Sequence, residues 1–298
     1  MDIQENIEMG ALARIRIFLE MIKFSHTVFA LPFAFTAALL AANGLPTGYQ
    51  TFWIIMAMVG ARTAAMGLNR IIDAEIDAEN PRTCGRAIPA GLLGKGTVLL
   101  FIALSTMLLL YAAYRLNPLC LYLSPVALGF LLLYSYCKRF TSLAHVVLGI
   151  CLAGAPLGAW IAIKGDIGLP ALLLGVAVLF WVAGFDILYA LQDVEFDRGK
   201  GLHSIPVKFG VHGSLWLARL FHLSMLGALA ALLITSGLGW IFGFGLAVTA
   251  GMLGYEHWLL RRGDLAKLDA AFFNMNGYIS ITIFLFTLAE VVVGRGGA

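Results

Sequence analysis

Long apolar runs dominate the chain, and short polar or turn-forming segments separate them. The hydrocarbon core of a bilayer is about 30 Å thick, so a helix that crosses it needs about 20 apolar residues. Breaks such as NGLPTG (43–48) and KGDIGLP (164–170) contain the Gly, Asn and Pro residues that end helices. The nine predicted membrane helices are 24–43, 50–71, 96–115, 118–136, 143–163, 169–190, 213–236, 238–260 and 270–293.

The composition agrees with this all-α integral membrane fold. Of the 298 residues, 60% are hydrophobic and 12% are charged, whereas a soluble globular chain is about one quarter charged. No Pro/Ser-rich linker or low-complexity tract divides the sequence, so we expect a single membrane domain over 1–298. The acidic, amphipathic start does not resemble a cleaved signal peptide.

The loop charges predict the orientation of the chain. Fifteen Lys and Arg residues fall on one side of the nine predicted helices, and only Arg115, Lys164 and Arg295 fall on the other. Because cytoplasmic loops carry the excess of positive charge, this predicts a cytoplasmic N-terminus and an external C-terminus. The four cysteines form no C-x-x-C pair and are expected to be free thiols.

An acidic motif follows the second predicted helix, in LNRIIDAEIDAENPRTCGR (68–86). Asn69, Asp73 and Asp77 are spaced by four residues, so they would share one stripe if the helix continues through them. A stripe of oxygen ligands is a candidate cation site. The alternative at this point is a solvated helix end with local ion pairs.

A second acidic motif favours the cation site. FDILYALQDVEFDRGKGLHSIPVKFG (185–210) places Asp186, Tyr189, Asp193 and Asp197 on one stripe, again at a predicted cytoplasmic helix end. Two such stripes on the same side of the membrane are expected to face each other.

The chemistry of two opposed carboxylate sets favours magnesium and a diphosphate. Mg²⁺ takes oxygen ligands and is commonly held by one or two carboxylates together with substrate phosphates. Basic residues in the neighbouring loops would balance the remaining charge, although each also serves as a topological charge. The candidates for diphosphate binding are Arg82, Arg86, Lys138, Arg139 and Lys200, with Tyr189 as a possible hydroxyl donor or packing residue.

These motifs together resemble the UbiA superfamily of intramembrane aromatic prenyltransferases. The matching segments are N-x-x-x-D-x-x-x-D (69–77), RTCGRAIPAG (82–91), YSYCKRFT (134–141) and D-x-x-Y-x-x-x-D-x-x-x-D (186–197). KFSHTVFALPFA (23–34) and GLHSIPVKFG (201–210) resemble the 4-hydroxybenzoate polyprenyltransferase-like branch.

The resemblance implies nine helices around a central cavity, Mg²⁺ dependence and a role in quinone synthesis. It implies a polyprenyl diphosphate and a small aromatic acceptor as substrates, in a bacterial inner membrane with the site facing the cytoplasm. No nucleic acid and no obligate protein partner are expected. The implied metal ligands are Asn69, Asp73, Asp77, Asp193 and Asp197; the catalytic residues are Asp186, Asp73 and Asp193; the acceptor-binding residues are Arg62, Asp186 and Arg139.

Other functions remain open from the sequence. A naphthoate acceptor for menaquinone is the alternative within the enzyme class. A cation- or proton-coupled transporter is the alternative from a different class, but it predicts charged sites near the middle of the bilayer. Here the acids gather at helix ends on one side.

Overall fold

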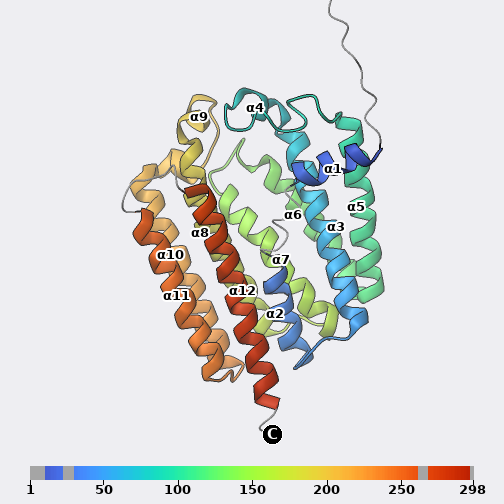
Figure 1. Cartoon of the computed structure of the whole chain (residues 1–298), viewed down its shortest axis with the longest axis vertical. Helices are drawn as coiled ribbons and strands as arrows, with labels where there is room; N and C mark the ends of the chain where they lie inside the picture. The colour runs from blue at the N-terminus through green and yellow to red at the C-terminus, as the bar shows by residue number, and fades with distance from the viewer. Residues whose placement is uncertain (1–10, 23–29, 261–267, 296–298) are drawn as a thin grey trace, which may run out of the picture.

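A computed structural model describes residues 11–22, 30–260 and 268–295, and these residues contain helices and no strand (Figure 1). The helices are α1 (Ala11–Met21), α2 (Leu31–Ala42), α3 (Gly48–Ile72), α4 (Ala74–Glu79), α5 (Lys95–Leu116), α6 (Pro118–Cys137), α7 (Ala144–Lys164), α8 (Leu169–Ala190), the 3₁₀ turn η2 (Leu191–Asp193), α9 (Val194–Gly199), α10 (Ile205–Thr235), α11 (Trp240–Leu260) and α12 (Leu268–Arg295).

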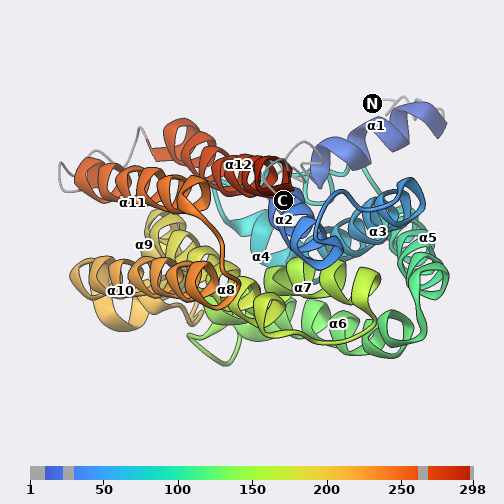
Figure 2. The same cartoon turned by 90° about the horizontal axis from the view of Figure 1, so that it is seen from below.

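The long helices run along one common direction, and the short helices α4 and α9 lie together at one end (Figure 1). α12 ends at the opposite end of the bundle. Seen along the bundle, α3, α5, α6, α7, α8, α10, α11 and α12 follow one another, and α2 lies against α7 and α12 (Figure 2). Both acidic motifs are therefore brought to the same end.

Each of the nine predicted membrane segments contains a helix. Seven described helices are long and apolar enough to cross a membrane, so the chain is an integral membrane protein. α2 has only 12 residues, and the predicted start of its segment, 24–29, lies outside the described residues. α11, with 21 residues, is not among these seven helices. The ninefold crossing and the orientation of the termini remain predictions.

α8 is the buried element that positions the second acidic motif. Trp181 is fully buried on α8, packs against Phe33 of α2, and donates through Nε1 to Asn276 Oδ1 of α12 at 2.9 Å. A Cβ atom at Gly149 of α7 would lie 2.4 Å from the Leu179 carbonyl oxygen. Only a glycine permits so close an approach of two membrane helices, and α8 is thereby fixed between its neighbours.

The structure corrects the expectation that each acidic motif is one continuous helix. α3 ends at Ile72 and α4 begins at Ala74, with Asp73 between them at φ −92° and ψ 3°. Asp193 is the last residue of η2 and the N-cap of α9, with φ −104° and ψ 4°. Both aspartates therefore adopt the sparsely populated bridge conformation. Asp competes with its own backbone for hydrogen bonds and favours helix ends, so each motif bends at its central acid.

Candidate active site

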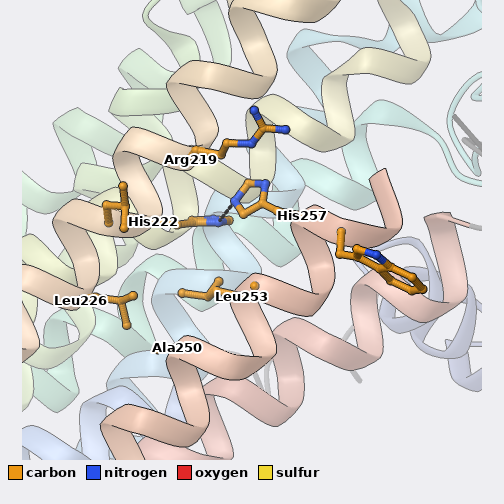
Figure 3. Close-up of a pocket in the computed structure, with 9 residues that line it drawn as sticks. Arg219, His222, Leu226, Ala250, Leu253 and His257 are labelled. Carbon is orange, nitrogen blue, oxygen red and sulfur yellow. Dashed lines mark hydrogen bonds between the residues drawn. The ribbon is translucent and has the colours of Figure 1, made fainter. Parts of the chain in front are cut away.

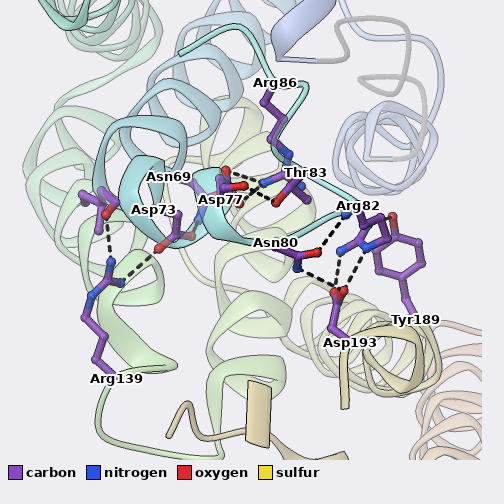
Figure 4. Close-up of polar contacts among 11 residues, drawn as sticks. Asn69, Asp73, Asp77, Asn80, Arg82, Thr83, Arg86, Arg139, Tyr189 and Asp193 are labelled. Atoms are coloured by element: carbon purple, nitrogen blue, oxygen red, sulfur yellow. Dashed lines mark hydrogen bonds and ion pairs between the residues drawn. The ribbon is translucent and has the colours of Figure 1, made fainter. Parts of the chain in front are cut away.

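The polar residues at the α4 and α9 end form one connected network (Figure 4). It draws on the ends of α3 and α8, on the segment 80–94 that follows α4, and on the segment between α6 and α7. The side chains come from both acidic motifs and from the basic residues that the sequence places beside them.

The first acidic motif is held by two arginines. Asn69 Nδ2 donates to Asp73 Oδ2 at 2.7 Å, and Asp73 Oδ1 accepts from Arg139 Nη1 at 3.0 Å. Arg86 Nη1 donates to both carboxylate oxygens of Asp77, at 2.7 and 2.6 Å. Asp77 is 6% exposed, so its charge is balanced inside the protein and not by water.

The second acidic motif is tied to the first by the segment after α4. Arg82 Nε donates to Asp193 Oδ1 at 2.9 Å, and Arg82 Nη2 donates to Asp193 Oδ2. Arg82 Nη1 donates to the Tyr189 hydroxyl at 2.9 Å, with the guanidinium 5.3 Å from the centroid of that ring. Asn80 Nδ2 also donates to Asp193 Oδ1, at 3.4 Å. The two halves of the chain thus meet at Asp193.

Two lysines complete the pairing of the acids. Lys138 Nζ lies 3.7 Å from Asp197 Oδ2, and Asp197 is only 2% exposed. Lys200 pairs with Glu79 at the surface. The loop that carries Lys200 is also fixed through its backbone, because the His203 amide donates to the Lys138 carbonyl at 2.7 Å.

The pKa shifts of Asp73 and Arg82 show how burial and ion pairing compete in the network. Burial raises the pKa of Asp73, and the hydrogen bond and charge of Arg139 offset this only in part. Burial lowers the pKa of Arg82, but its hydrogen bond and charge interaction with Asp193 outweigh the burial and leave that pKa raised. Arg82 therefore stays charged, whereas Asp73 depends on its partners to remain ionised.

The acids fit a metal ion whose ligands are partly carboxylates of the protein and partly oxygens of a bound anion. Within the described residues, no three His, Cys, Asp or Glu side chains converge as a cage for an ion. Mg²⁺ is commonly held by one or two carboxylates plus phosphate oxygens. Asp73 and Asp77 on one side, and Asp193 and Asp197 on the other, supply such a set once their basic partners turn to an anion. The assignment of these residues as metal ligands remains a prediction.

Arg62 differs from the other predicted basic residues because no described acid pairs with it. It lies on α3, on the same face as Asn69 and about 10 Å further into the bundle at 1.5 Å per residue. Its Nε is buried and has no hydrogen-bond partner among the described residues. An intramembrane cation without a partner is costly, so this position favours an anionic ligand.

Asp186 has a partner that the sequence did not reveal. His145, at the start of α7, is fully buried, and its Nδ1 lies 2.7 Å from Asp186 Oδ2. Its Nε2 accepts from the Ile205 amide at 3.4 Å. An Nε2 that accepts must be unprotonated, so the proton of a neutral ring is on Nδ1 and is donated to Asp186. His145 thereby fixes the carboxylate of Asp186 through its Oδ2 atom.

Comparison with known proteins identifies the family. The sequence model of the UbiA prenyltransferase family matches residues 30–278. The chain belongs to the UbiA prenyltransferase family. A relative from Tolumonas auensis, named 4-hydroxybenzoate octaprenyltransferase, is 31% identical over 251 residues, which are 82% of this chain and 85% of the relative. A relative of the same name from Aliivibrio fischeri is 29% identical over 86% of this chain and 88% of its own length.

Solved structures of UbiA proteins share the fold. The apo structure of a UbiA homologue from Aeropyrum pernix superposes with a TM-score of 0.81 at 31% identity, over 91% of this chain and 98% of that one. A UbiA homologue from Archaeoglobus fulgidus bound to GPP and Mg²⁺ superposes with a TM-score of 0.69 at 16% identity, over 93% and 99%. At that identity the second likeness concerns the fold alone.

The UbiA fold brings most of the predicted site residues together. Both acidic motifs and all five basic loop residues lie in or beside one network, as does Tyr189. The sequence analysis singled out neither His145 nor Asn80. A histidine at the first turn of a membrane helix beside a polar loop was the available signal for His145, because intramembrane ionisable residues are functional by default.

Proposed function

We propose that this UbiA-family enzyme transfers a polyprenyl group from a polyprenyl diphosphate to an aromatic hydroxy acid of the 4-hydroxybenzoate type. The names of the Tolumonas and Aliivibrio relatives support this acceptor class. The observation that carries the proposal is Arg62, a cation inside the bundle without a described acid partner. The competing candidate for the acceptor's carboxylate, Arg139, is already engaged with Asp73.

The diphosphate would bind at the network of acids and bases. Asn69, Asp73, Asp77, Asp193 and Asp197 would hold Mg²⁺ together with diphosphate oxygens. The bound Mg²⁺ neutralises charge on the departing diphosphate. On binding, the basic residues exchange carboxylate oxygens for phosphate oxygens and so keep their charge satisfied. The residues that make this exchange are Arg82, Arg86, Lys138, Arg139 and Lys200, while Tyr189 keeps Arg82 oriented through its hydroxyl.

The acceptor would bind deeper, between α3 and α8. Arg62 holds its carboxylate, and Asp186 accepts a hydrogen bond or proton from its phenol. The carbon–oxygen bond of the donor breaks and diphosphate leaves with the electron pair. The allylic carbon then bonds to the ring carbon beside the phenol, and the proton of that ring carbon passes to the released diphosphate. The apolar surroundings exclude water, which would otherwise capture the allylic cation.

The chain's membrane arrangement belongs to the same proposal. We infer one domain over the whole chain, nine crossings around a cavity, and an active site on the cytoplasmic face of a bacterial inner membrane. The loop charges support this orientation. The cavity would receive the isoprenoid tail from the lipid phase.

An acceptor panel tests the proposed substrate class. The purified enzyme receives geranyl diphosphate and Mg²⁺ with 4-hydroxybenzoate, phenol or 1,4-dihydroxy-2-naphthoate, and products are identified by mass. We expect prenylated 4-hydroxybenzoate and little product from phenol, which lacks the carboxylate for Arg62. Equal product from phenol would contradict the role of Arg62. Product from the naphthoate alone would move the enzyme to the menaquinone branch.

A further inference from the structure

A crevice lies between α10 and α11 (Figure 3), and none of its described lining residues belongs to the proposed active site. Its volume is about 450 Å³. Its polar wall consists of Arg219, His222 and His257, and the remaining lining is Leu223, Leu226, Ala250, Leu253, Gly254 and Trp258. α10 packs mainly against α8, and α11 mainly against α12, so the α10–α11 seam is thinly packed.

The position of the crevice along the bundle axis matches the headgroup region of one leaflet. Along α10, Arg219 lies about 24 Å from Thr235, and along α11 His257 lies about 26 Å from Trp240. Thr235 and Trp240 flank the turn at the far end of the bundle. A hydrocarbon core about 30 Å thick therefore places the polar wall near its other boundary, on the active-site side.

Exposed aromatic residues mark the same boundary. Trp216, Tyr255 and Trp258 are 59%, 49% and 45% exposed, and the rings of Tyr255 and Trp258 stack with centroids 5.8 Å apart. Trp and Tyr gather at the level of lipid headgroups, because their rings are amphipathic. The crevice thus opens where phospholipid headgroups meet their acyl chains.

The guanidinium of Arg219 on the crevice wall calls for an anion. The Arg219 guanidinium lies 5.2 Å from the centroid of the Trp216 ring, and no described carboxylate pairs with it. His222 Nδ1 lies 2.9 Å from His257 Nε2, so both imidazoles gather on the same wall as Arg219. No acidic residue belongs to the described lining. The ammonium of a zwitterionic lipid would therefore find no partner here.

We propose that this crevice binds a phospholipid with an anionic headgroup. The phosphate contacts Arg219 and the two histidines, and the start of an acyl chain lies along Leu223, Leu226 and Leu253. Basic pockets between membrane helices recognise acidic headgroups in this way. The volume of the crevice suits a headgroup and part of an acyl chain. The lipid fills the thinly packed seam between α10 and α11.

Retention of lipid by the purified full-length protein tests the proposal. Delipidated protein in detergent receives equal amounts of phosphatidylglycerol and phosphatidylcholine with the same acyl chains, and native mass spectrometry counts the retained lipids. We expect about a tenfold preference for phosphatidylglycerol: both lipids carry a phosphate, but the choline ammonium would lie beside the Arg219 guanidinium with no acid in the described lining to balance it. A parallel arm compares the thermal stabilisation by phosphatidylglycerol with that by inorganic phosphate, and we expect only the lipid to stabilise.

Variants distinguish recognition of the headgroup charge from the space that the crevice offers the lipid. Arg219→Gln should abolish the preference, Arg219→Lys should keep most of it, and Ala250→Leu should reduce retention by filling the crevice while the charges stay. Lys208→Gln is the matched control, because Lys208 is exposed on the same helix and outside the lining. Equal retention of both lipids by the wild type, an unchanged preference in Arg219→Gln, or equal stabilisation by inorganic phosphate would each overturn the proposal.

Discussion

Replacing Arg139 by Lys keeps the charge and removes the fork of the guanidinium. Arg139 Nη1 donates to Asp73 Oδ1 at 3.0 Å and to the Ser135 carbonyl at 2.9 Å, while Nη2 donates to the Ile72 carbonyl at 2.8 Å. These carbonyls belong to the ends of α3 and α6, where intrahelical donors are missing. Arg139 therefore fixes Asp73 and two helix ends with one planar group.

The expected loss follows from the contacts that a lysine cannot replace. A single ammonium can reach Asp73 and one carbonyl, but it cannot also reproduce the donor at the Nη2 position. One lost hydrogen bond to a charged group costs about 2 kcal/mol. If that cost falls on the transition state, kcat/KM of Arg139→Lys drops roughly 30-fold.

Arg86→Lys provides the contrast within the same network. Arg86 contacts Asp77 through Nη1 alone, so an ammonium can take its place, and we expect kcat/KM to change by about threefold or less. Arg16→Lys is the control. Arg16 forms an exposed ion pair with Glu20, so this substitution should leave kcat/KM unchanged.

The assay measures product formation at varied donor and acceptor concentrations, with thermal unfolding as a check on folding. A 30-fold loss in Arg86→Lys together with wild-type activity in Arg139→Lys would contradict the roles assigned to the two arginines. Equal losses in both variants would show that Arg86 uses both nitrogens on the bound substrate, which also contradicts it.

Three further outcomes follow from the site. Asp73→Ala and Asp193→Ala should each lower turnover by about a thousandfold or more with the fold retained, and activity within tenfold of wild type would contradict the metal clamp. Arg62→Met should raise the acceptor KM at least about tenfold while the donor KM stays constant; a rise in the donor KM would place Arg62 at the diphosphate. His145→Asn, which can still donate to Asp186, should retain more kcat than His145→Phe, and equal losses would mean that His145 only fills space.

The helices were predictable because a membrane imposes a length on each apolar run. The runs at 96–115, 118–136, 143–163 and 169–190 each coincide closely with α5, α6, α7 and α8. Sequence patterns were less informative where a helix changes geometry. The bends at Asp73 and Asp193 depend on backbone angles that the four-residue spacing does not specify.

The pairings in the site were not predictable, although most of their members were. Arg82 and Asp193 are 111 residues apart, and Arg139 and Asp73 are 66 apart. Sequence spacing reports which residues share a helix face, but it carries no information on which loop closes over which helix end. His145 illustrates the same limit, because only packing of α7 against α8 brings it to Asp186.

Joint measurement of ring product and diphosphate tests whether the chain couples loss of diphosphate to prenylation of the ring. The purified chain in liposomes receives a polyprenyl diphosphate and 4-hydroxybenzoate, and ring product and released diphosphate are quantified together with Mg²⁺ present or chelated. We expect prenylated 4-hydroxybenzoate and diphosphate in a one-to-one ratio, with both lost on chelation. Intact donor, or prenyl alcohol released without any ring product, would contradict it.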